Sequence, residues 1–446
     1  MDWVTKVYKS QNFLSYPKPM TDTIIALSTP VGTSALAIVR ASGKGVSAIC
    51  KAILPEFKMQ PRIASLTKAQ SQTAELIDNL LAIYFPAPNS YTGEDVLELF
   101  PHGNPFIVRK LMAALCEVPD VRLAERGEFT KRAFLNGKMD LTQSEALGDI
   151  LCASDAKSLS NAHRLLCGEV SCEIKALTDK IKEVSALLEL EVDFAEDIES
   201  NPQSTFQGYE KLEQILQNLQ NLKKRFKESQ NTMPKAAFFG APNAGKSTLI
   251  NTLVKEDRLL VSETPGTTRD FVEVPLHLPD GDILLIDTAG LAEEVQSEID
   301  KQAMQKTREI LEKANLKILV IDISIPPPKE FEKWRKSADL VVETHADIIG
   351  KENISINELQ KKLNSIFFPE AIGGEEAWIV SERQIDCIKK AEENALRALE
   401  LLKQSQAMEL AAFEMREARN SLCSVTGEIS DESVLEAIFN SYCIGK

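Results

Sequence analysis

The segment Gly240–Ser247 constrains the fold of this chain more than any other. It reads Gly-Ala-Pro-Asn-Ala-Gly-Lys-Ser and matches the pattern GxxxxGK[ST]. An apolar run at 236–239 precedes it, and a helical pattern at 248–253 follows it. Strand, glycine-rich loop and helix in this order are the context in which the motif wraps backbone N–H groups around phosphates. The sequence therefore predicts a nucleotide-binding P-loop in an α/β domain.

Two further motifs indicate a nucleotide hydrolase. The motif Asp287–Gly290 (Asp-Thr-Ala-Gly) ends an apolar run, so we expect Asp287 to hold a Mg²⁺-bound water and the Gly290 amide to contact the γ-phosphate. We expect Mg²⁺ to be ligated by the hydroxyls of Ser247 and Thr268. The segment around Thr268 is a switch loop that orders around the γ-phosphate and relaxes after hydrolysis, or else a plain turn.

Base recognition departs from the usual GTPase pattern. GTPases carry Asn-Lys-x-Asp after the fourth strand, and here the corresponding residues are Thr344-His345-Ala346-Asp347. Asp347 keeps the carboxylate that accepts two guanine N–H groups, but no convincing Ser-Ala-Lys loop follows. We predict retained guanine preference with weaker affinity. The predicted GTP-binding residues are Asn243, Ala244, Gly245, Lys246, Ser247, Thr248, Ser262, Glu263, Thr264, Pro265, Gly266, Thr267, Thr268, Asp287, Thr288, Ala289, Gly290 and Asp347.

Composition narrows the class of protein. A chain of 446 residues is long enough for about three domains. The formal net charge of −15 argues against a protein that coats nucleic acid by bulk electrostatics. No apolar run is long enough for a membrane span, the N-terminus has no signal-peptide pattern, and the eight cysteines form no CxxC pair. We therefore expect a cytoplasmic protein with reduced thiols and no membrane contact.

The spacing of apolar residues along the chain predicts a multidomain protein with α+β and α/β domains. Short strand-like runs at 23–27, 35–39 and 80–85 predict an N-terminal α+β domain over 1–138. Apolar residues at helical spacing predict a helical domain in two halves, 139–232 and 381–446. Between them, at 233–380, we expect an inserted Ras-like P-loop GTPase domain with a doubly wound sheet. Its strand-like runs are 236–239, 283–286, 317–321, 340–342 and 377–380.

Motifs outside the P-loop domain carry a family resemblance. Residues 90–99 read SYTGEDVLEL and are followed by Pro-His-Gly, residues 127–138 read GEFTKRAFLNGK, and the chain ends in Cys443-Ile444-Gly445-Lys446. Together with GAPNAGKST, TPGTTRDF and DTAGL, they resemble the tRNA modification GTPase family MnmE, also called TrmE. The resemblance spans nearly the whole chain in the order of the family's motifs.

The resemblance implies a homodimeric, potassium-dependent GTPase in which hydrolysis drives a conformational change. With the flavoprotein MnmG, which carries FAD, it would form a heterotetramer or larger complex. The complex would install aminomethyl or carboxymethylaminomethyl groups at C5 of the wobble uridine of certain tRNAs. A tetrahydrofolate derivative bound by the N-terminal domain, which also dimerises, would supply the one-carbon unit. The implied folate-binding residues are Arg40, Glu98, Lys138 and Lys446.

The catalytic assignments also rest on the resemblance. No arginine finger is evident, and the family implies a K⁺ ion that stabilises the charge of the transition state beside Lys246. A downstream carboxylate would orient the attacking water. Glu298 is our assignment and Asp300 the alternative, because an ungapped alignment falls on Ile299 between them. The expected K⁺ ligands are Asn243, Ser262, Thr264 and Thr267.

The sequence alone leaves the roles of several residues, and the function of the protein, with more than one interpretation. Asn243 is either a K⁺ ligand or a turn residue, and Cys443 is either a redox-active thiol or a small packing residue. The basic stretch 223–227 is either a nucleic-acid contact or a solvated helix face. Alternatives to a tRNA-modifying enzyme are a regulatory or ribosome-assembly GTPase, and a nucleotide-binding scaffold with weakened guanine selectivity.

Overall fold

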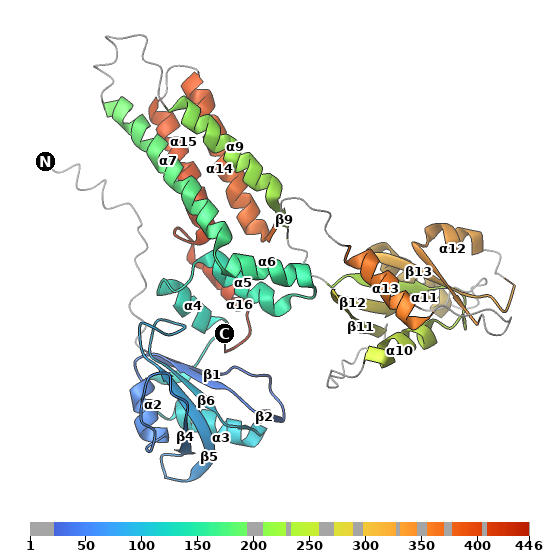
Figure 1. Cartoon of the computed structure of the whole chain (residues 1–446), viewed down its shortest axis with the longest axis horizontal. Helices are drawn as coiled ribbons and strands as arrows, with labels where there is room; N and C mark the ends of the chain where they lie inside the picture. Colours follow the sequence, from blue (N-terminus) through green and yellow to red (C-terminus); the bar gives the residue numbers. More distant parts are fainter. Residues whose placement is uncertain are drawn as a thin grey trace. The chain divides into compact units, whose positions relative to one another are not determined.

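The computed structural model describes residues 22–193, 208–228, 233–257, 272–288, 298–326, 331–345, 355–369, 377–403 and 408–445. They divide into two compact units (Figure 1). The first draws on Met1–Asp149, Ala162–Glu228 and Val380–Lys446, and the second on Ile150–Asn161 and Ser229–Ile379. The predicted fold class is confirmed, since a mixed domain, a two-part helical domain and an inserted α/β domain are all present. Among the described residues, no helix combines the length and apolar character that crossing a bilayer requires.

The N-terminal part of the first unit is a six-stranded sheet with the order β4-β5-β6-β3-β1-β8. Only β1 and β8 pair in parallel; the other neighbours are antiparallel. A two-stranded sheet and three helices accompany it. The elements are β1 (Thr23–Leu27), β2 (Ser34–Leu36), β3 (Val39–Ser42), α2 (Val46–Ile53), β4 (Ser65–Gln70), β5 (Leu76–Phe85), β6 (Val96–Phe100), β7 (His102–Gly103), α3 (Pro105–Cys116), β8 (Val121–Leu123) and α4 (Glu128–Leu135).

The prediction of one strand over 35–39 is wrong. β2 ends at Leu36 and pairs with β7, whereas β3 begins at Val39 and belongs to the large sheet. Between them the chain crosses from one sheet to the other. The backbone N–H of Ala37 donates to Pro101 O, and the N–H of Ile38 donates to Thr29 Oγ1. A continuous apolar run therefore does not mark a continuous strand here.

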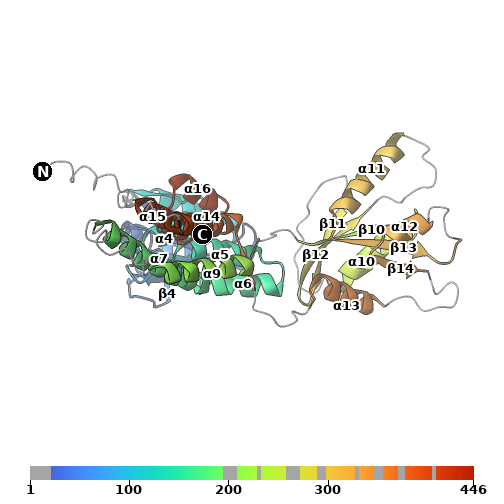
Figure 2. The ribbon, with the colours of Figure 1, turned by 90° about the horizontal axis from the view of Figure 1, so that it is seen from above.

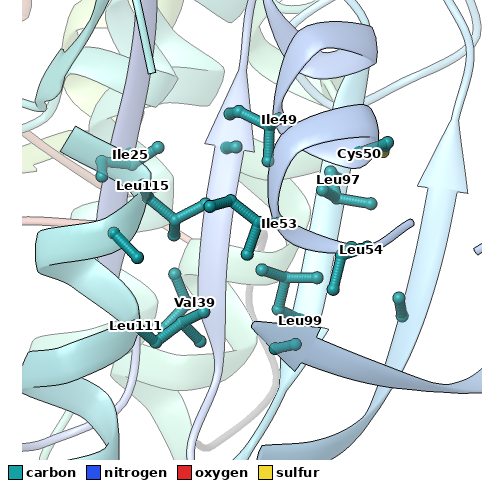
Figure 3. Packing of buried hydrophobic residues seen from close by; sticks show 14 of the residues in the cluster. Ile25, Val39, Ile49, Cys50, Ile53, Leu54, Leu97, Leu99, Leu111 and Leu115 are labelled. Carbon is teal, nitrogen blue, oxygen red and sulfur yellow. The ribbon is translucent and has the colours of Figure 1, made fainter. Parts of the chain in front are cut away.

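One face of the large sheet carries the core, covered by α2 and α3 (Figure 3). Alternate residues of each strand point into it, since side chains on a strand alternate between its two faces. On the opposite face, Phe129 of α4 packs against Ile24 and Ala26. The labelled core residues in Figure 3 are Ile25, Val39, Ile49, Cys50, Ile53, Leu54, Leu97, Leu99, Leu111 and Leu115.

A helical domain completes the first unit. In it α7, α9, α14 and α15 lie side by side, two from each half of the chain (Figure 1). Arg383 of α14 donates to both carboxylate oxygens of Glu145 in α5, and Thr142 donates to Val425 O of α15. These bonds join the two halves. The helices are α5 (Leu141–Cys152), α6 (Ala156–Leu166), α7 (Glu169–Asp193), α9 (Tyr209–Arg225), α14 (Glu382–Lys403), α15 (Met408–Thr426) and α16 (Glu432–Asn440).

The second unit is a five-stranded sheet with the order β11-β12-β10-β13-β14. α10 and α13 cover one face, and α11 and α12 the other (Figure 2), so neighbouring residues of a strand enter different cores. Phe238 packs with α10 and Phe239 with α12. The elements are β10 (Lys235–Phe239), α10 (Lys246–Asp257), β11 (Val272–Leu278), β12 (Gly281–Asp287), α11 (Glu298–Lys313), β13 (Leu316–Asp322), α12 (Phe331–Ser337), β14 (Leu340–Thr344) and α13 (Ile356–Phe367).

The fifth strand of this sheet differs from the prediction. The run 377–380 forms a strand, β15 (Trp378–Val380), but it is not part of the five-stranded sheet. The strand that sequence analysis missed is β11, which pairs antiparallel with β12 at the sheet edge. Pro275 argued against predicting a strand here, because proline normally interrupts strands. It is tolerated on edge strands such as β11. The short strand β9 (Phe226–Glu228) was also not predicted.

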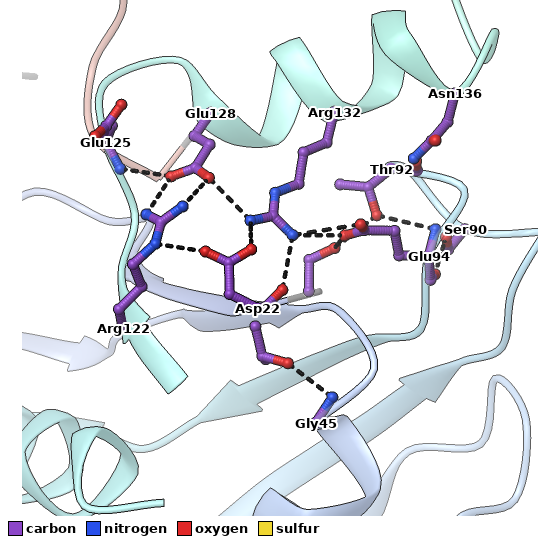
Figure 4. A network of polar contacts seen from close by, with 12 residues as sticks. Asp22, Gly45, Ser90, Thr92, Glu94, Arg122, Glu125, Glu128, Arg132 and Asn136 are labelled. Atoms are coloured by element: carbon purple, nitrogen blue, oxygen red, sulfur yellow. Dashed lines mark hydrogen bonds and ion pairs between the residues drawn. The ribbon is translucent and has the colours of Figure 1, made fainter. Parts of the chain in front are cut away.

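A network of two arginines and three carboxylates, centred on the buried Arg132, lies at α4 (Figure 4). The guanidinium of Arg132 is 1% exposed and lies within 3.2 Å of Asp22, Glu94 and Glu128. Arg122 bonds Asp22 and Glu128 at 2.6 Å. Although burial raises the pKa of Asp22 and of Glu128, bonds to these arginines lower both pKa values overall. The network ties the segment before β1 and the 90–95 loop to α4.

Replacing Arg132 with alanine is expected to destabilise the first unit by about 3 kcal/mol, since it removes the buried cation shared by three carboxylates and leaves Glu94 without a cationic partner among the described residues. Urea unfolding of the full chain followed by circular dichroism measures this. Lys110→Ala, which removes the exposed pair with Glu75, is the matched control and should cost less than about 1 kcal/mol. The contribution of Asp22 and Glu128 is complete above their unfolded-state pKa values and is lost as the pH falls through their lower folded-state pKa values. Equal effects of the two substitutions would contradict this account of the network.

Candidate functional site

The P-loop lies at the edge of the sheet where β10 ends. Gly240 has φ +149°, and a Cβ added there would lie 2.3 Å from Val320 O of β13. The loop therefore leaves the sheet in direct contact with the neighbouring strand, which only glycine permits. The loop ends where α10 begins, at Lys246.

Lys246 is 7% exposed and has no anionic partner at hydrogen-bond distance among the described residues. Its Nζ donates to Ala241 O at 2.9 Å and approaches Gly240 O at 3.4 Å, both carbonyls of its own loop. Burial lowers the pKa of Lys246, and the nearby Asp287 carboxylate opposes that shift. A cation held this way is placed to meet the negative charge of a phosphate.

Ser247 and Asp287, both predicted to act at a Mg²⁺ site, lie within hydrogen-bond distance of each other. Ser247 Oγ donates to Asp287 Oδ2 at 2.5 Å, which joins the start of α10 to the end of β12. Asp287 Oδ1 is buried and has no hydrogen-bond partner among the described residues. A buried carboxylate oxygen without a partner is costly unless a ligand satisfies it. The chemistry of these two side chains therefore fits a magnesium ion or its bound water.

Other predicted site residues lie in the same loop, in the first turn of α10 and directly after β12. Asn243 is exposed and has φ +63°, Ala244 is buried, and Thr248 is exposed in the first turn of α10. Thr288 donates its hydroxyl to Phe238 O at 2.7 Å, which fixes the end of β12 to β10. The predicted site residues that lie outside the described residues are Ser262, Glu263, Thr264, Pro265, Gly266, Thr267, Thr268, Ala289, Gly290, Asp347 and Lys446.

The two candidates for the water-orienting carboxylate lie at the first turn of α11. The helix begins at Glu298, with Asp300 two residues further on. Their side chains are outside the described part of the chain, so the choice between them stays a prediction.

At the far edge of the sheet, β14 ends at Thr344, which with His345 begins the segment predicted to recognise the base. Thr344 pairs with Asp322 in the β13–β14 ladder, and its Oγ1 donates to Ala244 O at 2.8 Å. His345 Nδ1 lies 2.8 Å from Asp322 Oδ2. A side-chain hydrogen bond from Ser324, followed by those from His345 and the backbone, lowers the pKa of Asp322 despite desolvation. Sequence analysis missed Asp322 and Ser324, for which no motif gave a signal.

The predicted folate residues Arg40 and Glu98 lie side by side in the first unit. They are directly opposite in the β3–β6 ladder, on the sheet face away from the main core. Arg40 Nε donates to Glu98 Oε1 at 2.9 Å, and its guanidinium lies 5.9 Å from the ring centroids of Tyr91 and Phe129. Lys138 contacts the same loop as Tyr91, since its Nζ donates to Pro88 O at 3.0 Å.

The end of the chain returns to this place. Gly445 O accepts hydrogen bonds from Arg40 Nη1 at 3.3 Å and from Ser28 Oγ at 3.2 Å, and Ile444 forms an isolated bridge with Arg126. Gly445 has φ +95°, and a Cβ there would lie 2.6 Å from Leu27 O. The C-terminal motif therefore lies against the end of β1, the strand that pairs with β3 and so with Arg40. Cys443 is exposed, so its reading as a buried packing residue is wrong.

Two of the four basic residues in the stretch 223–227 form ion pairs within the helical domain. Lys223 Nζ lies 2.6 Å from Glu392 of α14, and Arg225 Nη1 lies 3.1 Å from Glu173 of α7. These charges are partly neutralised within the helical domain. They favour the helix-face reading of the stretch over a nucleic-acid contact.

A P-loop, a serine–aspartate pair at the strand end and a doubly wound sheet define a P-loop nucleotide hydrolase domain. Comparison with known proteins defines the family. Residues 23–138 match the family model described as GTP-binding protein TrmE N-terminus, and residues 141–443 match the model of the MnmE helical domain. The chain belongs to the MnmE (TrmE) family of tRNA modification GTPases.

Curated relatives support this assignment over their full length. Three proteins named tRNA modification GTPase MnmE are similar to the chain. That of Carboxydothermus hydrogenoformans is 33% identical over 96% of this chain and 100% of its own length. That of Opitutus terrae is 34% identical, and that of Aquifex aeolicus 33% identical, with the same coverage of both chains.

Proposed function

We propose that this protein is a potassium-dependent GTP hydrolase that acts in tRNA modification. With a flavoprotein partner of the MnmG type, which carries FAD, it installs the aminomethyl or carboxymethylaminomethyl group at C5 of the wobble uridine. The observation that carries the hydrolase part is the Ser247–Asp287 pair beside the buried Lys246. Family membership supports the tRNA part. Hydrolysis would reshape the loops around the nucleotide and so drive a conformational change.

The chain's own residues have distinct roles in GTP binding. Lys246 neutralises the β- and γ-phosphates, and the P-loop N–H groups bind phosphate oxygens. Ser247 and Thr268 would hold Mg²⁺, with Asp287 on a water bound to it, and the ion when bound neutralises charge on the phosphate oxygens. Asp347 is our candidate for the guanine contact. Glu298, or alternatively Asp300, would orient the attacking water.

A monovalent cation would act beside Mg²⁺. Asn243 is exposed in the P-loop in a left-handed conformation, so its amide is open to a ligand from the solvent side. Its oxygen, with those of Ser262, Thr264 and Thr267, makes a donor set suited to K⁺, which stabilises the charge that develops on the phosphates.

GTP hydrolysis is expected to be at least about tenfold faster in K⁺ than in Na⁺ at equal ionic strength, because stabilising the transition state by about 1.4 kcal/mol is a factor of ten. Steady-state phosphate release measures the rate. Asn243→Ala should remove the K⁺ stimulation, and Glu298→Ala (or Asp300→Ala) should abolish turnover while GTP still binds. Equal rates in the two salts would refute the potassium proposal without touching GTP binding.

The N-terminal domain is our proposed site for a tetrahydrofolate derivative. Arg40 and Lys138 offer cations for the anionic glutamate tail, and Glu98 offers an acceptor for pterin N–H groups. The rings of Tyr91 and Phe129 flank Arg40. Lys446 follows Gly445, which Arg40 contacts, so the chain end would add a further cation. Cys443, exposed in the same segment, is our candidate for a redox-active thiol.

Arg40→Ala should weaken binding of 5-formyltetrahydrofolate roughly tenfold or more, because a charge-assisted hydrogen bond contributes about 1.5–3 kcal/mol. Isothermal titration with the full chain measures it. Lys110→Ala is the matched control, since Lys110 also lies over an aromatic ring, Phe106, and pairs with a carboxylate, Glu75, but belongs to α3 on the main-core face of the sheet. Undiminished folate binding by Arg40→Ala would count against this site.

A homodimer fits the exposed apolar surface of the same domain. Leu66 is 75% exposed and Leu81 41% exposed, and the two are directly opposite in the β4–β5 ladder. They share the sheet face of Glu98, because Ile83, two residues from Leu81, pairs with it. A second copy that covers this face would help to enclose the folate site.

The remaining assignments follow from the family. We infer that tRNA docking depends largely on the flavoprotein, since the chain carries a net charge of −15 and its α9 lysine and arginine are paired internally. The complex would be a heterotetramer or larger, in the cytoplasm.

The domain limits remain our proposal: 1–138, 139–232, 233–380 and 381–446. The substitutions at Thr344 and His345 favour one alternative, a domain with weakened guanine selectivity.

A further inference from the structure

The hydroxyl of Thr344 connects the end of β14 to the P-loop. Its Oγ1 lies 2.8 Å from Ala244 O and 3.1 Å from Ile321 O. A hydroxyl carries one hydrogen, so it donates mainly to the nearer acceptor, which is the carbonyl of the P-loop. Ala244 is 1% exposed, and water therefore has little access to this residue.

Fixing this carbonyl also fixes an amide that faces the phosphates. The Ala244–Gly245 peptide is planar and trans, so its C=O and N–H point in opposite directions. With the oxygen held on Thr344, the Gly245 N–H points away from β14. Gly245 is one of the P-loop residues whose N–H groups wrap the phosphates. Thr344 also packs directly on this peptide, since a Cβ on Gly245 would lie 3.6 Å from its Cγ2.

The position of Thr344 is itself fixed on both sides. In the ladder it pairs with Asp322, whose Oδ1 accepts bonds from the N–H and the hydroxyl of Ser324 at 2.9 and 2.5 Å. The next residue, His345, has φ +57° and lies 2.8 Å from the other carboxylate oxygen of Asp322. The hydroxyl therefore belongs to a strand end that pairs with β13 and is flanked by contacts to Asp322.

We propose that Thr344 is a positioning residue for phosphate binding: through the Ala244 carbonyl, its hydroxyl orients the Gly245 amide toward the β-phosphate of the nucleotide. The inference rests on the proposed GTP-binding function of the same loop. It concerns a residue that stands where GTPases carry the asparagine of the base-recognition motif. The contact is to the part of the ligand that GTP and GDP share, so it sets affinity for both and not the rate of hydrolysis.

Two pairs of variants isolate the hydroxyl. Thr344→Val differs from the natural chain by a methyl in place of the hydroxyl, and Thr344→Ala differs from Thr344→Ser only by the hydroxyl. We expect roughly three- to thirtyfold weaker binding of both GTP and GDP in the Val and Ala variants, the range that one lost buried hydrogen bond produces. Thr344→Ser should restore affinity. KM for GTP should rise in parallel while kcat at saturating GTP stays within about twofold.

Fluorescence titration with N-methylanthraniloyl GTP and GDP, in K⁺ and Mg²⁺ buffer, measures the affinities. Thr252→Val is the matched control, because Thr252 Oγ1 also donates to a backbone carbonyl, Thr248 O, at 2.8 Å within α10. It should bind both nucleotides like the natural chain. If the Val variant does not fold, as judged by circular dichroism, the Ser and Ala pair still decides the question.

Unchanged affinity in the variants without the hydroxyl would overturn the proposal, and so would a fall in kcat with KM unchanged. A loss confined to GTP would also overturn it, because the β-phosphate is common to both ligands. If the natural chain itself bound neither nucleotide, the proposed function would fail first. That result differs from a failure of the Thr344 proposal, because it would be seen in the natural chain without any substitution.

Discussion

The parallel pairing of β12, β10, β13 and β14 is the constraint on which the nucleotide site depends. Parallel neighbours end at the same edge of a sheet, so the residues that follow them are brought together whatever their separation in sequence. Here that edge gathers Gly240, Asp287, Asp322 and Thr344. The contact of Gly240 with Val320 O sets how closely the P-loop approaches the neighbouring strand. Ser247, Asp287, Thr344 and Ala244 then form the hydrogen bonds that give the site its shape.

In the first unit, the alternation of side chains along two strands likewise brings site residues together. Alternation along β3 and β6 buries Val39, Leu97 and Leu99 and, by the same rule, places Arg40 and Glu98 together on the other face. The C-terminal segment then reaches that face through Gly445. The helical domain makes this possible, because the bonds of Arg383 to Glu145 join the part of the chain after the inserted domain to the part before it.

Sequence reasoning succeeded where a local pattern has one physical explanation. The P-loop motif, the strand β1 at Thr23–Leu27 and the long amphipathic helices are such cases. It failed where tertiary context decides: the break between Leu36 and Val39 follows from a change of sheet, and β11 tolerates Pro275 because it is an edge strand. The hydrogen bond from Thr344 to Ala244 joins residues 100 positions apart, and no single-sequence pattern signals such a contact.

The central claim is that this sheet edge holds a guanine nucleotide by its phosphates, with Asp347 reading the base. Isothermal titration of GTP, GDP and ATP into the purified full chain, in potassium and magnesium buffer, tests it most directly. The account predicts that GTP and GDP both bind, and that ATP binds at least roughly tenfold more weakly, a difference of about 1.4 kcal/mol. Binding of ATP as tight as that of GTP, or no binding of GTP at saturating concentration, would contradict it.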